Sequence, residues 1–182
     1  MTHFAMLTAF GQDRPGIVAA LAEGLFRLGC NIEDTCMTLL RGEFAMMVMV
    51  RLPNGLAAGQ LSERLAPHIA SLDLTVLCRE LPREAAARAP EPDAPLYMLS
   101  VYGADHPGIV AKVARVVADH GGNITDMNTR VIGADDRPVY VMILEVQFQA
   151  DARPESLHQA LDRLTPSLGV DLTFRPIEQV RL

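Results

Sequence analysis

The sequence predicts an α+β protein made of two copies of one βαββαβ unit, and two observations support this prediction. The segment GQDRPGIVAALAEGL, which begins at Gly11, is written again as GADHPGIVAKVARVV from Gly103, 92 positions later. Within each copy the apolar pattern also changes between strand-like and helix-like in the same order. Each unit is therefore predicted to be ferredoxin-like, a four-stranded antiparallel sheet with two helices on one face.

The first copy follows this plan along its length. Residues 3–10 are apolar and partly alternating, as in a strand. From residue 17, apolar residues recur on one helical face until Gly29, a residue type that accepts the left-handed backbone of a helix stop. Two strands, 31–40 and 43–52, are joined by a short Arg-Gly turn typical of a hairpin. A second helix carrying Leu61, Leu65 and Ile69 and a final strand over 72–81 complete the unit.

The second copy repeats these signals with small shifts. A strand over 96–103 leads to a helix from residue 109 that stops at Gly121, followed by strands 123–132 and 139–148. Extra residues, GADDRP, lie in the turn between these two strands. The last helix and strand then follow, and the DLT at Asp73 recurs 98 positions later. Agreement over the whole unit indicates duplication.

The domain boundaries follow from the segment between the copies. Residues 82–94 are rich in Pro and Ala, which predicts an extended linker with room for one helical turn. The predicted domains are residues 1–81 and 95–182. Units of this size gain stability by burying more surface, so we expect either tight packing of the two modules or a homodimer.

Composition excludes several functional classes. The net charge is −6 and Lys112 is the only lysine, which argues against direct nucleic-acid binding. Three cysteines without metal or redox spacing favour a reduced, cytoplasmic protein. There is no leader-like N-terminus and no apolar run long enough to cross a membrane. The five histidines are scattered, and we find no catalytic, metal-binding or cofactor motif, so we expect no enzyme.

The repeated loop suggests a binding site. Asp13 and Asp105 are expected to be helix N-caps, with Pro15 and Pro107 just inside each helix. Gly16 and Gly108 then leave the backbone donors of a helix N-terminus open to an anionic group.

An asparagine follows each of these helices, Asn31 in the first copy and Asn123 in the second. Its amide can accept a hydrogen bond from an ammonium and donate one to a carboxylate, which suits a free amino acid. The same residues also make a good turn and a good helix stop, so a purely structural role stays open. A nucleotide loop is disfavoured because neither G-x-G-x-x-G nor G-K-[ST] is present.

The segments DRPGIVAALAEGLFRLGCNIED and DHPGIVAKVARVVADHGGNITD resemble the first strand–helix–strand part of ACT domains, small regulatory modules that bind amino acids. Two such modules in a short chain resemble the glycine cleavage system transcriptional repressor group. The resemblance implies that modules pair side by side and bind ligand between the loop of one and the second-strand start of its neighbour. The ligand residues it implies are Gly11, Asp13, Arg14, Pro15, Gly16, Ile17 and Asn31, and Gly103, Asp105, His106, Pro107, Gly108, Ile109 and Asn123.

The resemblance also implies a function. We expect a non-enzymatic sensor of a small amino acid, glycine or serine being the candidates, that controls transcription of glycine-linked metabolism through a protein partner. The alternatives are an interaction protein and a trans-acting regulatory subunit of a metabolic enzyme, both with vestigial ligand sites.

Overall fold

A computed structural model describes residues 3–86, 94–133, 138–149 and 153–177, and the chain divides into two compact units, residues 1–89 and 90–182. The elements of the first unit are β1 (His3–Gln12), α1 (Ile17–Arg27), β2 (Asn31–Leu40), β3 (Glu43–Leu52), α2 (Ala58–Ile69), the 3-10 turn η1 (Ala70–Leu72), β4 (Thr75–Leu81) and α3 (Arg83–Ala86). Those of the second unit are β5 (Leu96–Ala104), α4 (Ile109–Asp119), β6 (Gly122–Ile132), β7 (Val139–Phe148), α5 (Pro154–Leu168) and β8 (Val170–Pro176).

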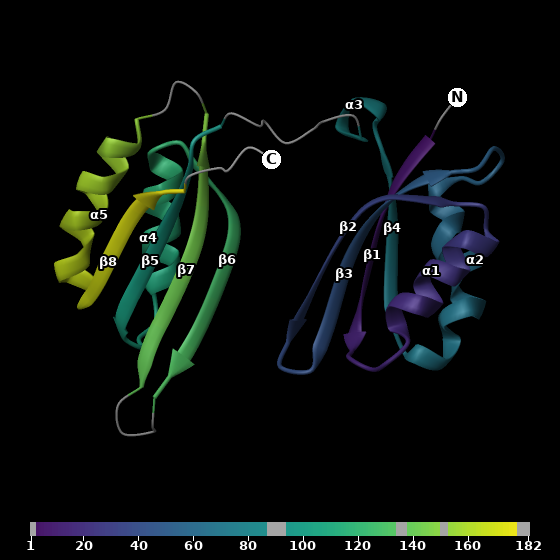
Figure 1. Cartoon of the computed structure of the whole chain (residues 1–182), viewed down its shortest axis with the longest axis horizontal. Coiled ribbons are helices and arrows are strands. Elements are labelled where there is room, and N and C mark those ends of the chain that lie inside the picture. Colours follow the sequence, from purple (N-terminus) through teal and green to yellow (C-terminus); the bar gives the residue numbers. More distant parts are fainter. Residues whose placement is uncertain (1–2, 87–93, 134–137, 150–152, 178–182) are drawn as a thin grey trace. The chain divides into compact units, whose positions relative to one another are not determined.

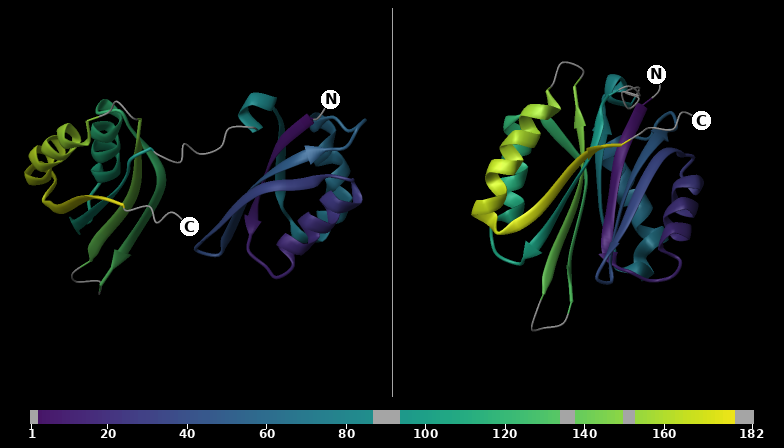
Figure 2. Two further views of the ribbon diagram at one scale, coloured as in Figure 1. Left: turned by 45° about the horizontal axis from the view of Figure 1, so that its top comes forward. Right: turned by 60° about the vertical axis from the view of Figure 1, so that its left-hand side comes forward.

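Each unit contains one antiparallel four-stranded sheet, ordered β2-β3-β1-β4 in the first and β6-β7-β5-β8 in the second. Helices α1 and α2 cover one face of the first sheet, and α4 and α5 cover one face of the second (Figures 1 and 2). The predicted fold class, two ferredoxin-like βαββαβ units, is confirmed.

The core of each unit lies between the sheet and its two helices. In the first unit the helical positions predicted from the 3.6-residue period, Ile17, Leu21 and Leu25, are buried against alternate residues of β1 and β3. In the second unit Ile109, Val113 and Val117 take the same places. The apolar periodicity of the sequence therefore marks the residues that form each core.

The turns also follow local sequence. Arg41 and Gly42 join β2 to β3 with positive φ angles of 51° and 87°, the backbone of a tight hairpin turn. The turn between the equivalent strands of the second copy carries the insertion GADDRP. Most of this insertion, residues 134–137, lies outside the described residues. The predicted helical turn of the linker is present as α3, whereas residues 87–93 lie outside the described part of the chain. The predicted domain boundary stays a prediction.

Strands β2 and β6 are edge strands. Every residue of β2 is exposed, and its far side has no neighbouring strand in the described sheet. Both strands shift register at one point, between Ile32 and Asp34 in β2 and between Ile124 and Asp126 in β6. Each unit thus presents a long strand edge that could pair with another strand.

Candidate ligand site at the strand–helix loops

The loop between β1 and α1 ends in an uncapped helix. Gly16 is the N-cap residue of α1, with φ at 94°, and no side chain caps the helix. Gly108 occupies the same place before α4, with φ at 99°. A Cβ added to either glycine would meet no atom within 4 Å, so the space beside each helix N-terminus is open. First-turn N–H groups are consequently available to an anionic group.

This geometry corrects two predictions from the sequence. Asp13 and Asp105 are not the N-caps, because each lies three positions before the glycine that takes that role. Pro15 and Pro107 lie in the turn before each helix and not inside it. The physical reason is the left-handed backbone of Gly16 and Gly108, which turns the chain into each helix three residues later than a cap at the aspartate would.

Asp13 is instead an exposed loop residue. Its backbone N–H donates to the carbonyl oxygen of Gly42 at 2.8 Å, which ties the loop to the β2–β3 turn. Asp105 is exposed as well. Neither carboxylate caps its helix, and both side chains are accessible from solvent.

Gly11 and Gly103 have a packing role. A Cβ on Gly103 would lie 2.7 Å from Cγ1 of Val170 and 2.9 Å from the carbonyl oxygen of Gly169. A Cβ on Gly11 would lie 2.9 Å from the carbonyl oxygen of Asp73. Both glycines let the end of the first strand of each unit approach the backbone that enters its last strand. Ile17 and Ile109 are core residues, and only their backbones border the loop.

Arg14 and His106 point to the end of the second helix of their units. The Arg14 guanidinium donates to the carbonyl oxygen of Ser71 at 3.4 Å. The His106 ring places Nε2 2.7 Å from the carbonyl oxygen of Leu168 and Nδ1 3.1 Å from that of Pro107. The Leu168 carbonyl, and then that of Pro107, raise the pKa of His106 because they stabilise the protonated ring.

Asn31 lies at the other end of its unit. Gln12 at the end of β1 and Leu40 at the end of β2 both pair with Glu43, whereas Asn31 pairs with Arg51 at the far end of the ladder. Figure 1 shows the β1–α1 loop beside the β2–β3 turn, with α1 running back along the sheet. Eleven helical residues span roughly 16 Å, so one unit does not bring its asparagine to its own loop.

Asn31 belongs to a polar network that the sequence did not reveal. Its side-chain amide donates to Oε1 of Glu33 at 2.8 Å, and Nε of Arg51 lies 2.8 Å from the same oxygen. The bond from Asn31 is the main cause that lowers the pKa of Glu33, and Arg51 adds to it. The i,i+2 spacing of Asn31 and Glu33 is visible in the sequence. The contact between Arg51 and Glu33, in contrast, depends on the register between β2 and β3. In the second unit Asn123 faces Gln147 instead.

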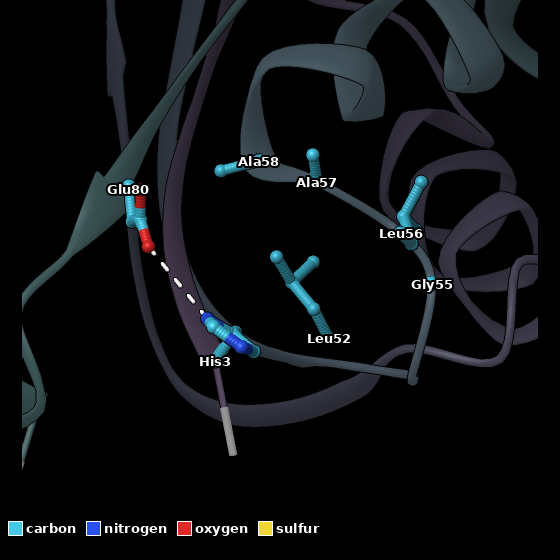
Figure 3. Close-up of a pocket in the computed structure, with 7 residues that line it drawn as sticks. All are labelled: His3, Leu52, Gly55, Leu56, Ala57, Ala58 and Glu80. Atoms are coloured by element: carbon cyan, nitrogen blue, oxygen red, sulfur yellow. Dashed lines mark ion pairs between the residues drawn. The ribbon is translucent and has the colours of Figure 1, made fainter. Parts of the chain in front are cut away.

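A separate pocket of about 340 Å³ lies near the end of the first unit that holds Asn31 (Figure 3). It is formed by the start of β1, the end of β3 and the loop that leads into α2, with His3 Nδ1 3.7 Å from Oε1 of Glu80 at its rim. Leu52, Gly55, Leu56, Ala57 and Ala58 form the remaining wall. None of the predicted ligand residues lines it.

Reactive groups are scarce in the described residues. Burial raises the pKa of the Cys78 thiol to about 11 and also raises that of Cys30, so neither is poised as a thiolate. Among the described residues no group of three His, Cys, Asp or Glu side chains could hold a metal ion. None of the described helices is both long and apolar enough to span a membrane.

Comparison with known proteins agrees with this architecture. Models of the ACT domain match residues 3–79 and residues 97–162. The chain is 27% identical over 170 residues to the glycine cleavage system transcriptional repressor of Escherichia coli (strain K12), covering 92% of this chain and 86% of that protein.

Two solved structures match this chain over nearly its whole length. A crystal structure of a protein of unknown function from Galdieria sulphuraria is similar with a TM-score of 0.79 and 27% identity, covering 98% of this chain and 100% of the other. A candidate glycine cleavage system transcriptional repressor has a TM-score of 0.70 and 18% identity over 98% of this chain and 99% of its own, a likeness of fold.

Proposed function

Since this chain belongs to the ACT domain family and carries two such domains, we propose that it is a non-enzymatic regulatory protein that senses a small amino acid. The observation that carries the proposal is the pair of open helix N-termini beside exposed carboxylates, at Gly16 with Asp13 and at Gly108 with Asp105. Backbone N–H groups suit an α-carboxylate and the aspartate suits an α-ammonium.

The site is completed by a neighbouring ACT domain. Asn31 is about a helix length from its own loop, but antiparallel pairing of two β2 edges would place the start of one strand beside the end of the other. The end of β2 is where the Asp13 loop is bonded to the hairpin turn. The asparagine of the neighbour would then face the loop and supply an acceptor for the ammonium and a donor for the carboxylate.

We propose glycine or serine as the ligand and transcription of glycine-linked metabolism as the regulated process. The support is the likeness to the Escherichia coli glycine cleavage system transcriptional repressor, which extends over both domains. The net charge of −6 and the single lysine argue for regulation through a protein partner and not through direct contact with nucleic acid. Such a protein would act in the cytoplasm.

Calorimetric titration of the full chain with each common amino acid tests the ligand. We expect binding of glycine or serine that is lost when Asn31 and Asn123 are both changed to serine. Asn128→Ser is the matched control, because Asn128 is an exposed asparagine in the middle of β6, bonded to Asp126 at 2.8 Å. No heat with any amino acid would refute the proposed sensor while leaving the fold untouched.

Co-purification tests the partner. A regulator of transcription should retain a transcription factor from a lysate of its own organism in a manner that glycine or serine changes. Retention of a metabolic enzyme, unaffected by the Asn31 and Asn123 changes, would favour the alternative of a trans-acting subunit with vestigial sites.

A further inference from the structure

We propose that Arg14 and His106 are positioning residues, each anchoring its ligand loop to the end of the second helix of its unit, and that only the second loop is anchored in a pH-dependent way. The consequence for ligand binding rests on the proposed function. The anchoring itself stands on the geometry of the two loops.

Both loops place a basic side chain at a helix end. Leu168 is the last residue of α5, and its carbonyl oxygen accepts from Nε2 of His106 at 2.7 Å. Ser71 lies in the 3-10 turn that continues α2, and its carbonyl oxygen accepts from Arg14. Carbonyl groups at a helix C-terminus lack partners within the helix and carry partial negative charge. A cation there both satisfies an acceptor and stabilises the helix end.

The two anchors differ in their response to pH. Both ring nitrogens of His106 face carbonyl oxygens, at 2.7 Å and 3.1 Å, and only the protonated ring can donate from both. After deprotonation one nitrogen lone pair faces a carbonyl oxygen, and the bond that remains loses its charge assistance. Arg14 keeps its charge over the whole range.

The surrounding charges act in opposite directions. Asp105 in the loop raises the pKa of His106 and Lys112 on α4 lowers it, while the contact from the α5 side is the backbone carbonyl of Leu168. A folded-state pKa above the ordinary value of about 6.5 means that the anchor contributes fully below that pH. Its contribution is lost as the pH rises through the raised pKa.

The anchor bears on the site because His106 is two residues from Gly108, the N-cap of α4. A held loop keeps the first-turn N–H groups of α4 in place, and a released loop must be ordered again when ligand binds. The second site is therefore expected to bind its ligand more weakly at pH values above the one at which His106 loses its proton. The first site, held by Arg14, is expected to change little.

Nuclear magnetic resonance of the full chain, with no ligand, tests the anchor. The ring signals of the histidines are followed from pH 5 to pH 9, and His106→Gln identifies the His106 signal by its loss. We expect His106 to titrate above the ordinary histidine pKa of about 6.5. As it deprotonates, the backbone order parameters of residues 105, 106, 108 and 109 should fall, because the charge-assisted hydrogen bond to the Leu168 carbonyl is lost. Residues 13, 14, 16 and 17 of the first loop serve as the internal control.

His106→Arg is the conservative variant and should remove the pH dependence of the second loop while keeping its backbone order. Titration of His106 at the ordinary value, or order parameters of residues 105, 106, 108 and 109 that do not change as it titrates, would overturn the proposal. Should His106→Arg not fold, the wild-type titration decides alone. Titration with each common amino acid at pH 6 and pH 9 then separates the two claims, because absence of binding at both pH values refutes the sensor and leaves the anchor standing.

Discussion

Replacing Gly103 with alanine tests whether this glycine serves packing or ligand access. Its Cβ would lie 2.7 Å from Cγ1 and 2.8 Å from Cα of Val170, its partner across the β5–β8 ladder. The Cα belongs to the backbone, so relief requires the two strands to separate. Overpacking of this kind costs about 1–3 kcal/mol, from which the lower entropy of alanine in the unfolded chain recovers a part.

For a unit of this size a loss of about 1 kcal/mol lowers the unfolding midpoint by roughly 4–8 °C. Differential scanning calorimetry of the full chain should therefore show the unfolding transition of the second unit displaced downward by on the order of 10 °C. Gly59→Ala is the control with the opposite sign, since Gly59 lies in α2 with nothing within 4 Å of an added Cβ. A Gly103→Ala protein as stable as the wild type would refute the packing interpretation.

Three further outcomes are expected. Alkylation followed by mass spectrometry should modify Cys36 in the native protein, whereas Cys30 and Cys78 should react only after unfolding, because Cys36 is exposed and burial raises the pKa of the other two thiols. Leu65→Ala, at a fully buried helix position, should lower the urea unfolding free energy by about 2–5 kcal/mol, and a smaller loss would mean that the core collapses around the cavity. Glu33→Gln should lower the urea midpoint at pH 7, and the loss should shrink as the pH falls. The lowered pKa of Glu33 gives stability above its ordinary range that is lost as the pH falls through the folded value, so a loss of equal size at every pH would contradict the network.

The sequence by itself determined the architecture. Helix periodicity identified Leu21, Leu61 and their neighbours as core residues because burial of one helical face depends on local spacing. The tight turn at Arg41 and Gly42 and the stop at Gly29 depend on backbone preferences of single residues, which are also local. Duplication strengthened each of these predictions by repeating the same signals.

Only the tertiary structure decided how the candidate ligand residues are placed. The sequence predicts Asp13 as an N-cap because an aspartate shortly before an apolar helix commonly takes that role. The left-handed turn at Gly16 instead places the start of the helix at Ile17. Asn31 and the β1–α1 loop belong to the same repeated sequence segment, yet they lie at opposite ends of the unit because α1 runs between them. Arg14 and His106 reach the carbonyl groups of Ser71 and Leu168, which lie more than fifty residues away, and no local pattern encodes such contacts. Side-chain chemistry could be read along the chain, whereas the meeting of distant groups depends on how strands pair and helices pack.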